Sequence, residues 1–199
     1  MPAGRLPGWV ERFGQRHGLV AWWASEPALT ELSAADGATA ALHWPLPGPV
    51  VGEASALTAR VNATDPRNVV LVRRGGWAVG AARGEELVRS RCGTRYVQGK
   101  TKAGGWSQQR YARRRAQQAD GLLDAAEAAV REVLAGSSGP VVLGGDRALL
   151  DRLLRALADT DVPGRVTARR LDVPDPRLAV LRQAVLDAGA VDVELNDLA

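Results

Sequence analysis

The apolar positions after residue 65 fall into segments that alternate between strand-like and helix-like spacing. Apolar runs at 68–73, 77–82 and 86–98 predict three strands, and Gly75-Gly76 predicts a hairpin turn between the first two. The segments that follow predict alternating helices and strands, at 107–134, 141–143, 147–157, 162–168 and 176–187. The order β-β-β-α-β-α-β-α predicts an α/β fold with a mixed sheet, an antiparallel meander followed by crossover strands, and flanking helices.

The N-terminal third of the chain shows a weaker pattern. It predicts one amphipathic helix and two short strands, at 6–17, 19–24 and 38–43. Three prolines within residues 45–49 predict a loop, because proline cannot donate to a strand ladder. We therefore expect a single α/β domain over residues 1–199, in which residues 1–64 form an N-terminal layer on a core of residues 65–199.

Charge is distributed unevenly along the chain. The 33 residues between Glu86 and Asp120 include no aspartate or glutamate but hold nine of the 26 lysines and arginines. In their middle, Gly104-Gly105 gives the backbone conformational freedom and leaves no side chain in the way of a ligand. We predict that residues 98–109 form a polyanion-binding loop and that the polyanion is nucleic acid.

The side chains around the glycine pair suit contacts to phosphates and bases. A lysine or arginine on a phosphate adds salt-dependent affinity without sequence preference, and an aromatic ring can stack on a base. The predicted RNA-binding residues are Lys100, Lys102, Trp106, Arg110, Arg113, Arg114 and Arg115.

The helix predicted after the loop carries its charges in an order that does not favour helix stability. Four arginines lie in its first turns, and its acidic residues, Asp120, Asp124 and Glu127, lie later. The helix dipole favours acids early and bases late, by about 0.3–1 kcal/mol each. The reversal predicts that the arginines have a ligand; the alternative is a solvated basic face on a helix held by packing.

Two glutamines, Gln108 and Gln109, stand where the predicted loop meets the helix. Glutamine is neither a general base nor a nucleophile near neutral pH, but its amide donates to an oxyanion and accepts from a water molecule. The pair is therefore a candidate for positioning a hydrolytic water. The alternative is that both are surface residues at a helix start.

The composition argues against several other kinds of site. Cys92 is the one cysteine, so we expect neither an intrachain disulfide nor a zinc cluster of cysteines. Residues 136–146 are glycine-rich but lack the lysine of a P-loop, and no carboxylate cluster suits a two-metal centre. No apolar run reaches the ~18 residues of a membrane span. We expect a cytoplasmic protein with no metal, no small-molecule cofactor and no membrane partner.

The segment Gly104-Gly-Trp-Ser-Gln-Gln-Arg-Tyr-Ala-Arg-Arg-Arg115 resembles the catalytic loop of the peptidyl-tRNA hydrolase domain in eukaryotic and archaeal release factors. In that family a Gly-Gly-Gln loop precedes a helix that begins with an Arg-aromatic-Ala-Arg run. The chain also resembles the release-factor-like rescue hydrolases of the VLRF family, which use a Gly-Gly-Ser-Gln form, and in particular their actinobacterial branch. Here Trp106 and Ser107 separate Gly105 from Gln108, and an alignment of the arginine run without a gap puts Trp106 in the glutamine's place.

The resemblance implies a fold and a function. The family's domain has a ribonuclease H-like α/β core. Its loop enters the peptidyl transferase centre of the large ribosomal subunit and frees a stalled nascent chain from its tRNA. By resemblance, Gln108 or Gln109 orients the water, with Gln108 favoured because it follows a serine, and Gly104 and Gly105 let the loop fit. The implied partners are large-subunit rRNA and peptidyl-tRNA.

Other functions remain open on the sequence alone. The chain has no room for a codon-reading domain, so we expect action without a stop codon. A non-catalytic RNA- or ribosome-binding module would use the same basic loop, and an endonuclease would leave a shortened tRNA.

Overall fold

The computed structural model of the protein describes the backbone of residues 1–94 and 107–199 and the side chains of residues 1–94 and 119–199. Contacts divide the chain into two compact units. Unit 1 consists of Met1–Asp65 together with Leu186–Ala199, and unit 2 consists of Pro66–Val185. The first boundary lies one residue from the expected end of the N-terminal layer. The last residues of the chain belong with the first ones.

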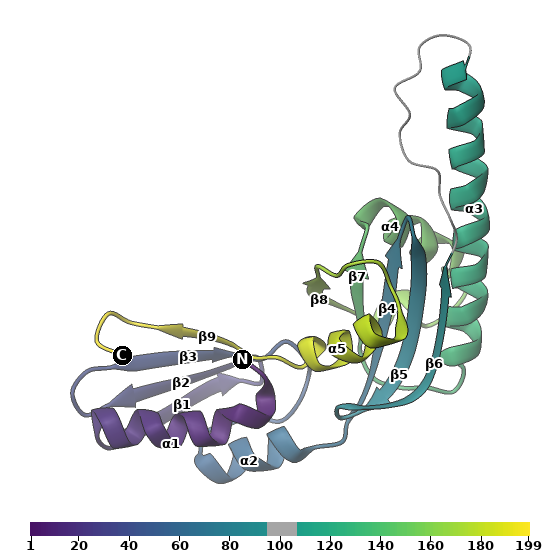
Figure 1. Cartoon of the computed structure of the whole chain (residues 1–199). Coiled ribbons are helices and arrows are strands. Elements are labelled where there is room, and N and C mark those ends of the chain that lie inside the picture. Colours follow the sequence, from purple (N-terminus) through teal and green to yellow (C-terminus); the bar gives the residue numbers. More distant parts are fainter. Residues whose placement is uncertain (95–106) are drawn as a thin grey trace. The chain divides into compact units, whose positions relative to one another are not determined.

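Unit 1 is a four-stranded antiparallel sheet with helices packed on one face (Figure 1). The sheet has the order β1-β2-β3-β9, formed by β1 (Val20–Glu26), β2 (Leu29–Ala34), β3 (Thr39–His43) and β9 (Asp192–Leu195). The helices are η1 (Ala3–Arg5, a 3-10 turn), α1 (Leu6–His17) and α2 (Ala54–Asn62). Leu6 of α1, Leu57 of α2 and Leu32 of β2 are buried together in one apolar core.

The predictions for unit 1 are correct for three elements and miss four others. The predicted helix is α1, and the two predicted strands are β1 and β3. The elements that were not predicted are η1, α2, β2 and β9. In β2 the buried position Thr30 is polar, and its hydroxyl donates to Val51 O at 3.0 Å and accepts from the Trp44 indole at 3.1 Å. A polar residue at a buried position hides the alternation that identifies a strand.

Unit 2 is built on a five-stranded mixed sheet with the order β6-β5-β4-β7-β8. Its strands are β4 (Pro66–Arg73), β5 (Gly76–Arg83), β6 (Glu86–Thr94), β7 (Val141–Gly145) and β8 (Val166–Leu171). Strands β4, β5 and β6 pair antiparallel, and β7 pairs in parallel with both β4 and β8. The prediction of a mixed sheet with a meander followed by crossover strands is therefore confirmed.

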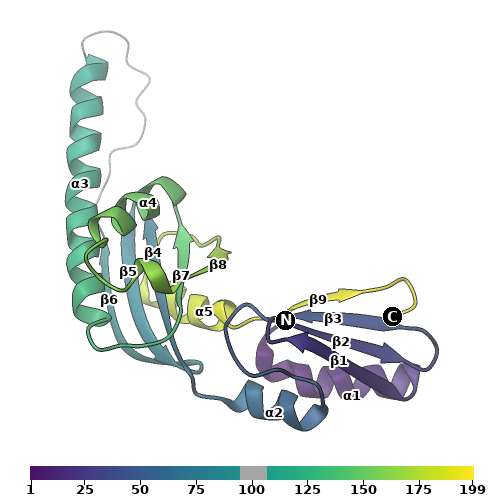
Figure 2. The same ribbon diagram turned by 180° about the vertical axis from the view of Figure 1, so that it is seen from behind.

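Helices cover both faces of this sheet. The helices are α3 (Ser107–Val133), α4 (Arg147–Ala156), the 3-10 turn η2 (Pro163–Arg165) and α5 (Leu178–Ala188). α3 and α4 bury their apolar side chains against one face. Leu181 of α5 lies over Gly80 of β5 on the other face. Accordingly, α5 is seen in front of the sheet in Figure 1, and α4 is seen in front of it in Figure 2. η2 occupies the first half of the predicted strand 162–168, and β8 therefore begins at Val166.

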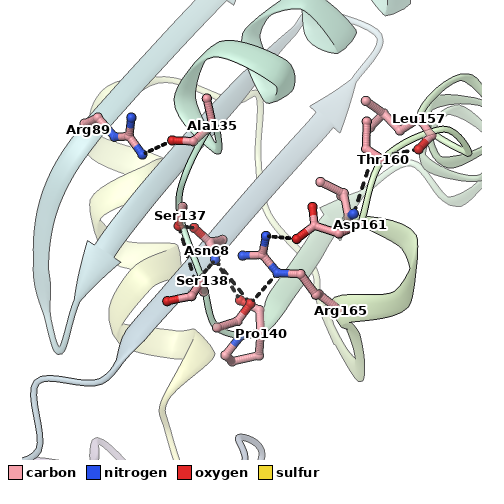
Figure 3. A network of polar contacts seen from close by, with 12 residues as sticks. Asn68, Arg89, Ala135, Ser137, Ser138, Pro140, Leu157, Thr160, Asp161 and Arg165 are labelled. Carbon is pink, nitrogen blue, oxygen red and sulfur yellow. Dashed lines mark hydrogen bonds and ion pairs between the residues drawn. The ribbon is translucent and has the colours of Figure 1, made fainter.

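A buried asparagine joins the two halves of the unit 2 sheet at the start of β4 (Figure 3). The Asn68 side chain is fully buried and donates to Ser138 O at 2.8 Å, while its oxygen accepts from the Ser137 hydroxyl at 2.6 Å. Arg165 adds a bond to Gly139 O at 2.8 Å. These bonds satisfy the backbone of the turn between α3 and β7, and so fix the point at which α3 returns to the sheet.

Candidate nucleic-acid interface

The predicted site falls at the connection between β6 and α3. Five of its residues lie outside the described part of the chain: Lys100, Lys102, Gly104, Gly105 and Trp106. The other six lie on the first turns of α3, which begins at Ser107: Gln108, Gln109, Arg110, Arg113, Arg114 and Arg115. The structure describes no side chain of these eleven residues, so their roles stay predictions.

The C-terminal half of α3 is a buried wall of unit 2. Leu122, Ala126 and Val130 are at most 1% exposed and pack against the sheet with residues such as Val79 of β5. Leu123 and, just after the helix, Leu134 are buried as well, and Ala119 is partly buried. The first turns of α3 continue past the end of the sheet (Figure 1). Helix α3, called the arm below, is therefore held by the core through its C-terminal half. Its N-terminal half carries the predicted site.

Ion pairs fix the acidic half of α3 to its neighbours. Asp120 accepts from Arg152 of α4 at 2.6 Å. Arg131 of α3 bonds Asp159 at 2.7 Å and Glu127 at 2.9 Å, and these bonds lower the pKa of Asp159 and raise the pKa of Arg131. Two of the acidic residues late in the helix, Asp120 and Glu127, therefore form ion pairs, although the helix dipole does not favour acids at these positions. The arginines early in the helix are not explained by these contacts.

Strand β6, which leads into the site, is held to the other end of α3. Arg91 pairs with Glu132, and Arg89 donates to Ala135 O at 2.9 Å. Two arginines of the acid-free block therefore serve the fold rather than a ligand. In the sequence, Arg89 and Arg91 belong to the same block of basic residues that predicts nucleic-acid binding.

Near the end of β6, two glycines pack too closely to their neighbours for a larger residue. A Cβ on Gly93 would lie 2.6 Å from the ring of Trp77, and a Cβ on Gly76 would lie 2.6 Å from Gly93 O. Trp77 is buried, so its ring has no room to move aside. Strand β6 therefore ends, at Thr94, next to closely packed residues.

The described side chains form no candidate metal site. Within residues 1–94 and 119–199, no three His, Cys, Asp or Glu side chains are grouped to hold a metal ion. None of the described helices is both long enough and apolar enough to cross a membrane. The arrangement thus consists of the packed sheet of unit 2, the connection between β6 and α3 with its basic residues and glycines, and the helix α3 that follows the connection.

Comparison with known proteins bears on what this arrangement is. No curated protein sequence matches the chain. One similar solved structure is the Vms1 mitochondrial localization core, with a TM-score of 0.49 and 12% identity over 83% of this chain and 76% of that one. At that TM-score the likeness establishes neither a shared fold nor a function. The family described as "Actinobacteria/chloroflexi VLRF1 release factor" matches residues 65–194, a range that includes the whole of unit 2. The chain therefore belongs to the actinobacterial and chloroflexi VLRF1 release factor family.

Proposed function

We propose that this protein is a peptidyl-tRNA hydrolase that releases stalled nascent chains on the large ribosomal subunit in the cytoplasm, without reading a stop codon. Membership in a family of release factors supports a role in release or rescue at the ribosome. The observation that carries the finer proposal is the position of Gln108 and four arginines on the first turns of α3, next to the Gly104-Gly105 pair.

The core of unit 2 fits the domain to which the loop belongs in related release factors. We propose that it is ribonuclease H-like. Its support is the strand order, in which a three-stranded antiparallel meander lies beside two strands parallel to its first strand.

Of the two glutamines, we assign the water-positioning role to Gln108. Gln108 precedes Ala126 by 18 residues, which is five turns at 3.6 residues per turn, so the two positions lie on one line along α3. Ala126 is fully buried against the sheet, and β6 of that sheet ends at Thr94, where the connection to α3 begins. Gln109 is rotated from this line by about 100°. The support for Gln108 is therefore its place on the same line along α3 as Ala126, which packs on the sheet from which the connection begins.

The basic residues would bind rRNA or the acceptor end of the tRNA. Lys100 and Lys102 precede the glycine pair, and Arg110, Arg113, Arg114 and Arg115 follow it. Each phosphate contact releases counterions, so affinity from these residues falls as salt rises. The ribosome would supply the rest of the catalytic centre, and the isolated protein would then hydrolyse nothing.

The proposed reaction is hydrolysis of the ester between the nascent peptide and the tRNA ribose. An amide that donates to the developing oxyanion or orients the attacking water stabilises the transition state more than the ground state. Loss of one such contact typically costs about 2.7–4 kcal/mol of barrier, or roughly 10²–10³ in rate. A rate loss of that size on replacement distinguishes a catalytic glutamine from a glutamine that is only a surface residue.

The experiment is release of a labelled nascent chain from purified large subunits that carry peptidyl-tRNA. We expect Gln108→Ala to slow release about 10²–10³-fold while the protein still co-sediments with the subunit. Gln109→Ala tests the neighbouring position. Gln117→Ala is a matched control, because it removes the same side chain from the same helix two and a half turns further on, about 9 residues at 3.6 per turn. We expect it to release at the wild-type rate.

Two results would contradict the hydrolase. If wild-type protein binds large subunits in a salt-sensitive way but releases no peptide, the protein is a non-catalytic RNA- or ribosome-binding module. If peptide is released on a tRNA that has lost 3′ nucleotides, the protein is an endonuclease. The length of the tRNA product, read on a denaturing gel, separates the second case from hydrolysis.

A further inference from the structure

The two units carry opposite net charge. Unit 1 holds four basic and ten acidic residues, a net charge of −6, whereas unit 2 holds 22 basic and 12 acidic residues, a net charge of +10. The predicted RNA-binding residues all belong to unit 2. A surface with the charge of unit 1 repels phosphate, so it does not suit nucleic acid.

Part of the acidic charge of unit 1 lies on the face of its sheet that α1 does not cover. Positions on β1, β2, β3 and β9 alternate between the buried core and this open face. The four strands contain four carboxylates and no lysine or arginine: Glu26, Glu31, Asp192 and Glu194. Figure 2 shows the sheet with α1 behind it.

One cross-strand row on the open face combines a tryptophan with two of these carboxylates. Trp23 pairs with Glu31, Glu31 pairs with Ala41, and Ala41 pairs with Glu194. Trp23 is 66% exposed, which is unusual for so large an apolar side chain. The small side chain of Ala41 separates the two glutamates, whose strands are about 10 Å apart because neighbouring strands lie about 4.8 Å apart.

The row lines an open hollow of about 590 Å³. Besides the four residues of the row, Ala21, Ser33 and Thr39 are among the residues that line it. Glu194 already lies 3.4 Å from the imidazole of His43. Glu31 forms no ion pair with any residue in the described part of unit 1. The hollow thus has small residues in its floor, a tryptophan on one side and carboxylates on both sides.

We propose that this hollow, defined by Trp23, Glu31, Ala41 and Glu194, binds an arginine-bearing segment of a protein partner. A guanidinium above Ala41 lies between Glu31 and Glu194, and the exposed ring of Trp23 stands in the same row beside Glu31. Guanidinium groups pair with carboxylates in charge-assisted hydrogen bonds and stack on tryptophan. Tryptophan and arginine are also the residues most often found at the centre of protein interfaces. This site is separate from the proposed hydrolase site and does not depend on it.

The test uses the full-length protein and a labelled Gly/Ser peptide that carries several arginines, with binding measured by fluorescence anisotropy. The same peptide with citrulline in place of arginine keeps the shape and loses the charge. We expect the arginine peptide to bind and the citrulline peptide not to bind. We expect Trp23→Ala and Glu31→Gln each to weaken binding about three- to tenfold, and the double change Glu31→Gln with Glu194→Gln to weaken it further.

Glu11→Gln is the matched control, because Glu11 is an exposed acid of the same unit on α1, which packs on the other face of the sheet. We expect it to leave the affinity within about twofold, as for an isolated surface charge. Thermal melts of each variant show that unit 1 is still folded, and glutamine keeps the shape of the glutamate it replaces.

Several results would overturn the proposal. Equal weakening by Glu11→Gln and Glu31→Gln would mean that the peptide senses only net charge. Binding of a single-stranded RNA oligonucleotide that Trp23→Ala abolishes would make the face a nucleic-acid site. Self-association that Trp23→Ala abolishes would replace the partner by a second copy of this chain. Absence of binding to wild-type protein would remove the site altogether.

Discussion

Arginines that look alike in the sequence of the acid-free block have different surroundings. Arg91 pairs with Glu132 on the last turn of α3, and Arg89 donates to Ala135 O, two residues after the helix ends. Arg113 and Arg114 belong to the first turns of α3, where the structure describes no side chain. The described contacts therefore account for Arg89 and Arg91, and a ligand stays the predicted role of Arg113 and Arg114. The residue type alone does not separate these two cases.

A second residue-scale contact makes the stability of unit 1 depend on pH. Asp36 accepts a bond from the Ala38 backbone N–H at 3.0 Å and contacts the buried His17 ring at 2.8 Å; the backbone bond is the larger cause of its lowered pKa, and the His17 bond is the next. A carboxyl whose pKa is lower in the folded state stabilises the fold above its unfolded pKa, near 3.9. That stabilisation is lost as the pH falls through the folded value.

We therefore expect wild-type protein to melt at a higher temperature than Asp36→Asn near pH 6, and the difference to shrink as the pH falls below about 4. Asp197→Asn, a change at an exposed aspartate of the same unit, is the control. Melting temperatures across this pH range measure the effect. A difference between wild type and Asp36→Asn that is constant with pH, or that grows in acid, would contradict the assignment.

At the scale of elements, α3 is the part that links the fold to the proposed function. Its apolar stripe packs on β5, it lies beside β6, and Asp120 and Arg131 connect it to α4 and the turn after α4. Buried packing contributes more to stability than exposed ion pairs do, since solvent screens the latter. The core should therefore hold the arm chiefly through its leucines and valines.

We expect Leu122→Ala to lower the free energy of unfolding by about 2–5 kcal/mol, because Leu122 is 1% exposed. Asp120→Asn breaks the exposed pair with Arg152 and should cost less than about 1 kcal/mol. Denaturant titrations measure both changes, and hydrogen exchange of the α3 amides shows whether the helix itself opens. A larger loss from Asp120→Asn than from Leu122→Ala would mean that ion pairs, not packing, hold the arm.

At the scale of the whole molecule, the charge is divided between the units. Unit 2, at +10, carries the predicted RNA-binding residues, and unit 1, at −6, carries the hollow proposed for a basic protein segment. The net charge of +4 conceals this division. Opposite charges on two units suit two partners of opposite charge, a nucleic acid and a basic protein.

This division predicts how salt affects binding to the large subunit. We expect the double change Arg113→Ala with Arg114→Ala to weaken binding and to lower the slope of log affinity against log salt by about 1 per lost phosphate contact. Arg155→Ala, a change at an exposed arginine of α4, should leave the slope unchanged. Co-sedimentation at a series of salt concentrations measures the slopes. Equal slopes for wild type and the double variant would remove these arginines from the RNA contact.

Much of unit 2 was predictable because its signals are local. Glycine turns and apolar runs identified β4, β5 and β6, and helical spacing identified the buried half of α3. The start of α4 also follows a local rule, because its N-cap Asp146 accepts from Leu149 N at 3.2 Å. The glycines, glutamines and arginines of the proposed site were identified by their spacing alone, and their roles stay predictions.

The sequence by itself determined the order of elements in unit 2, the acid-free block and the family resemblance, because periodicity and charge runs are properties of neighbouring residues. Only the tertiary structure decided that β9 pairs with β3 and that Leu186–Ala199 belongs with the first 65 residues. It also brought Trp23, Glu31 and Glu194 into one row. These contacts join residues far apart in the chain through short strands, whose few polar positions carry no local sign of their partners.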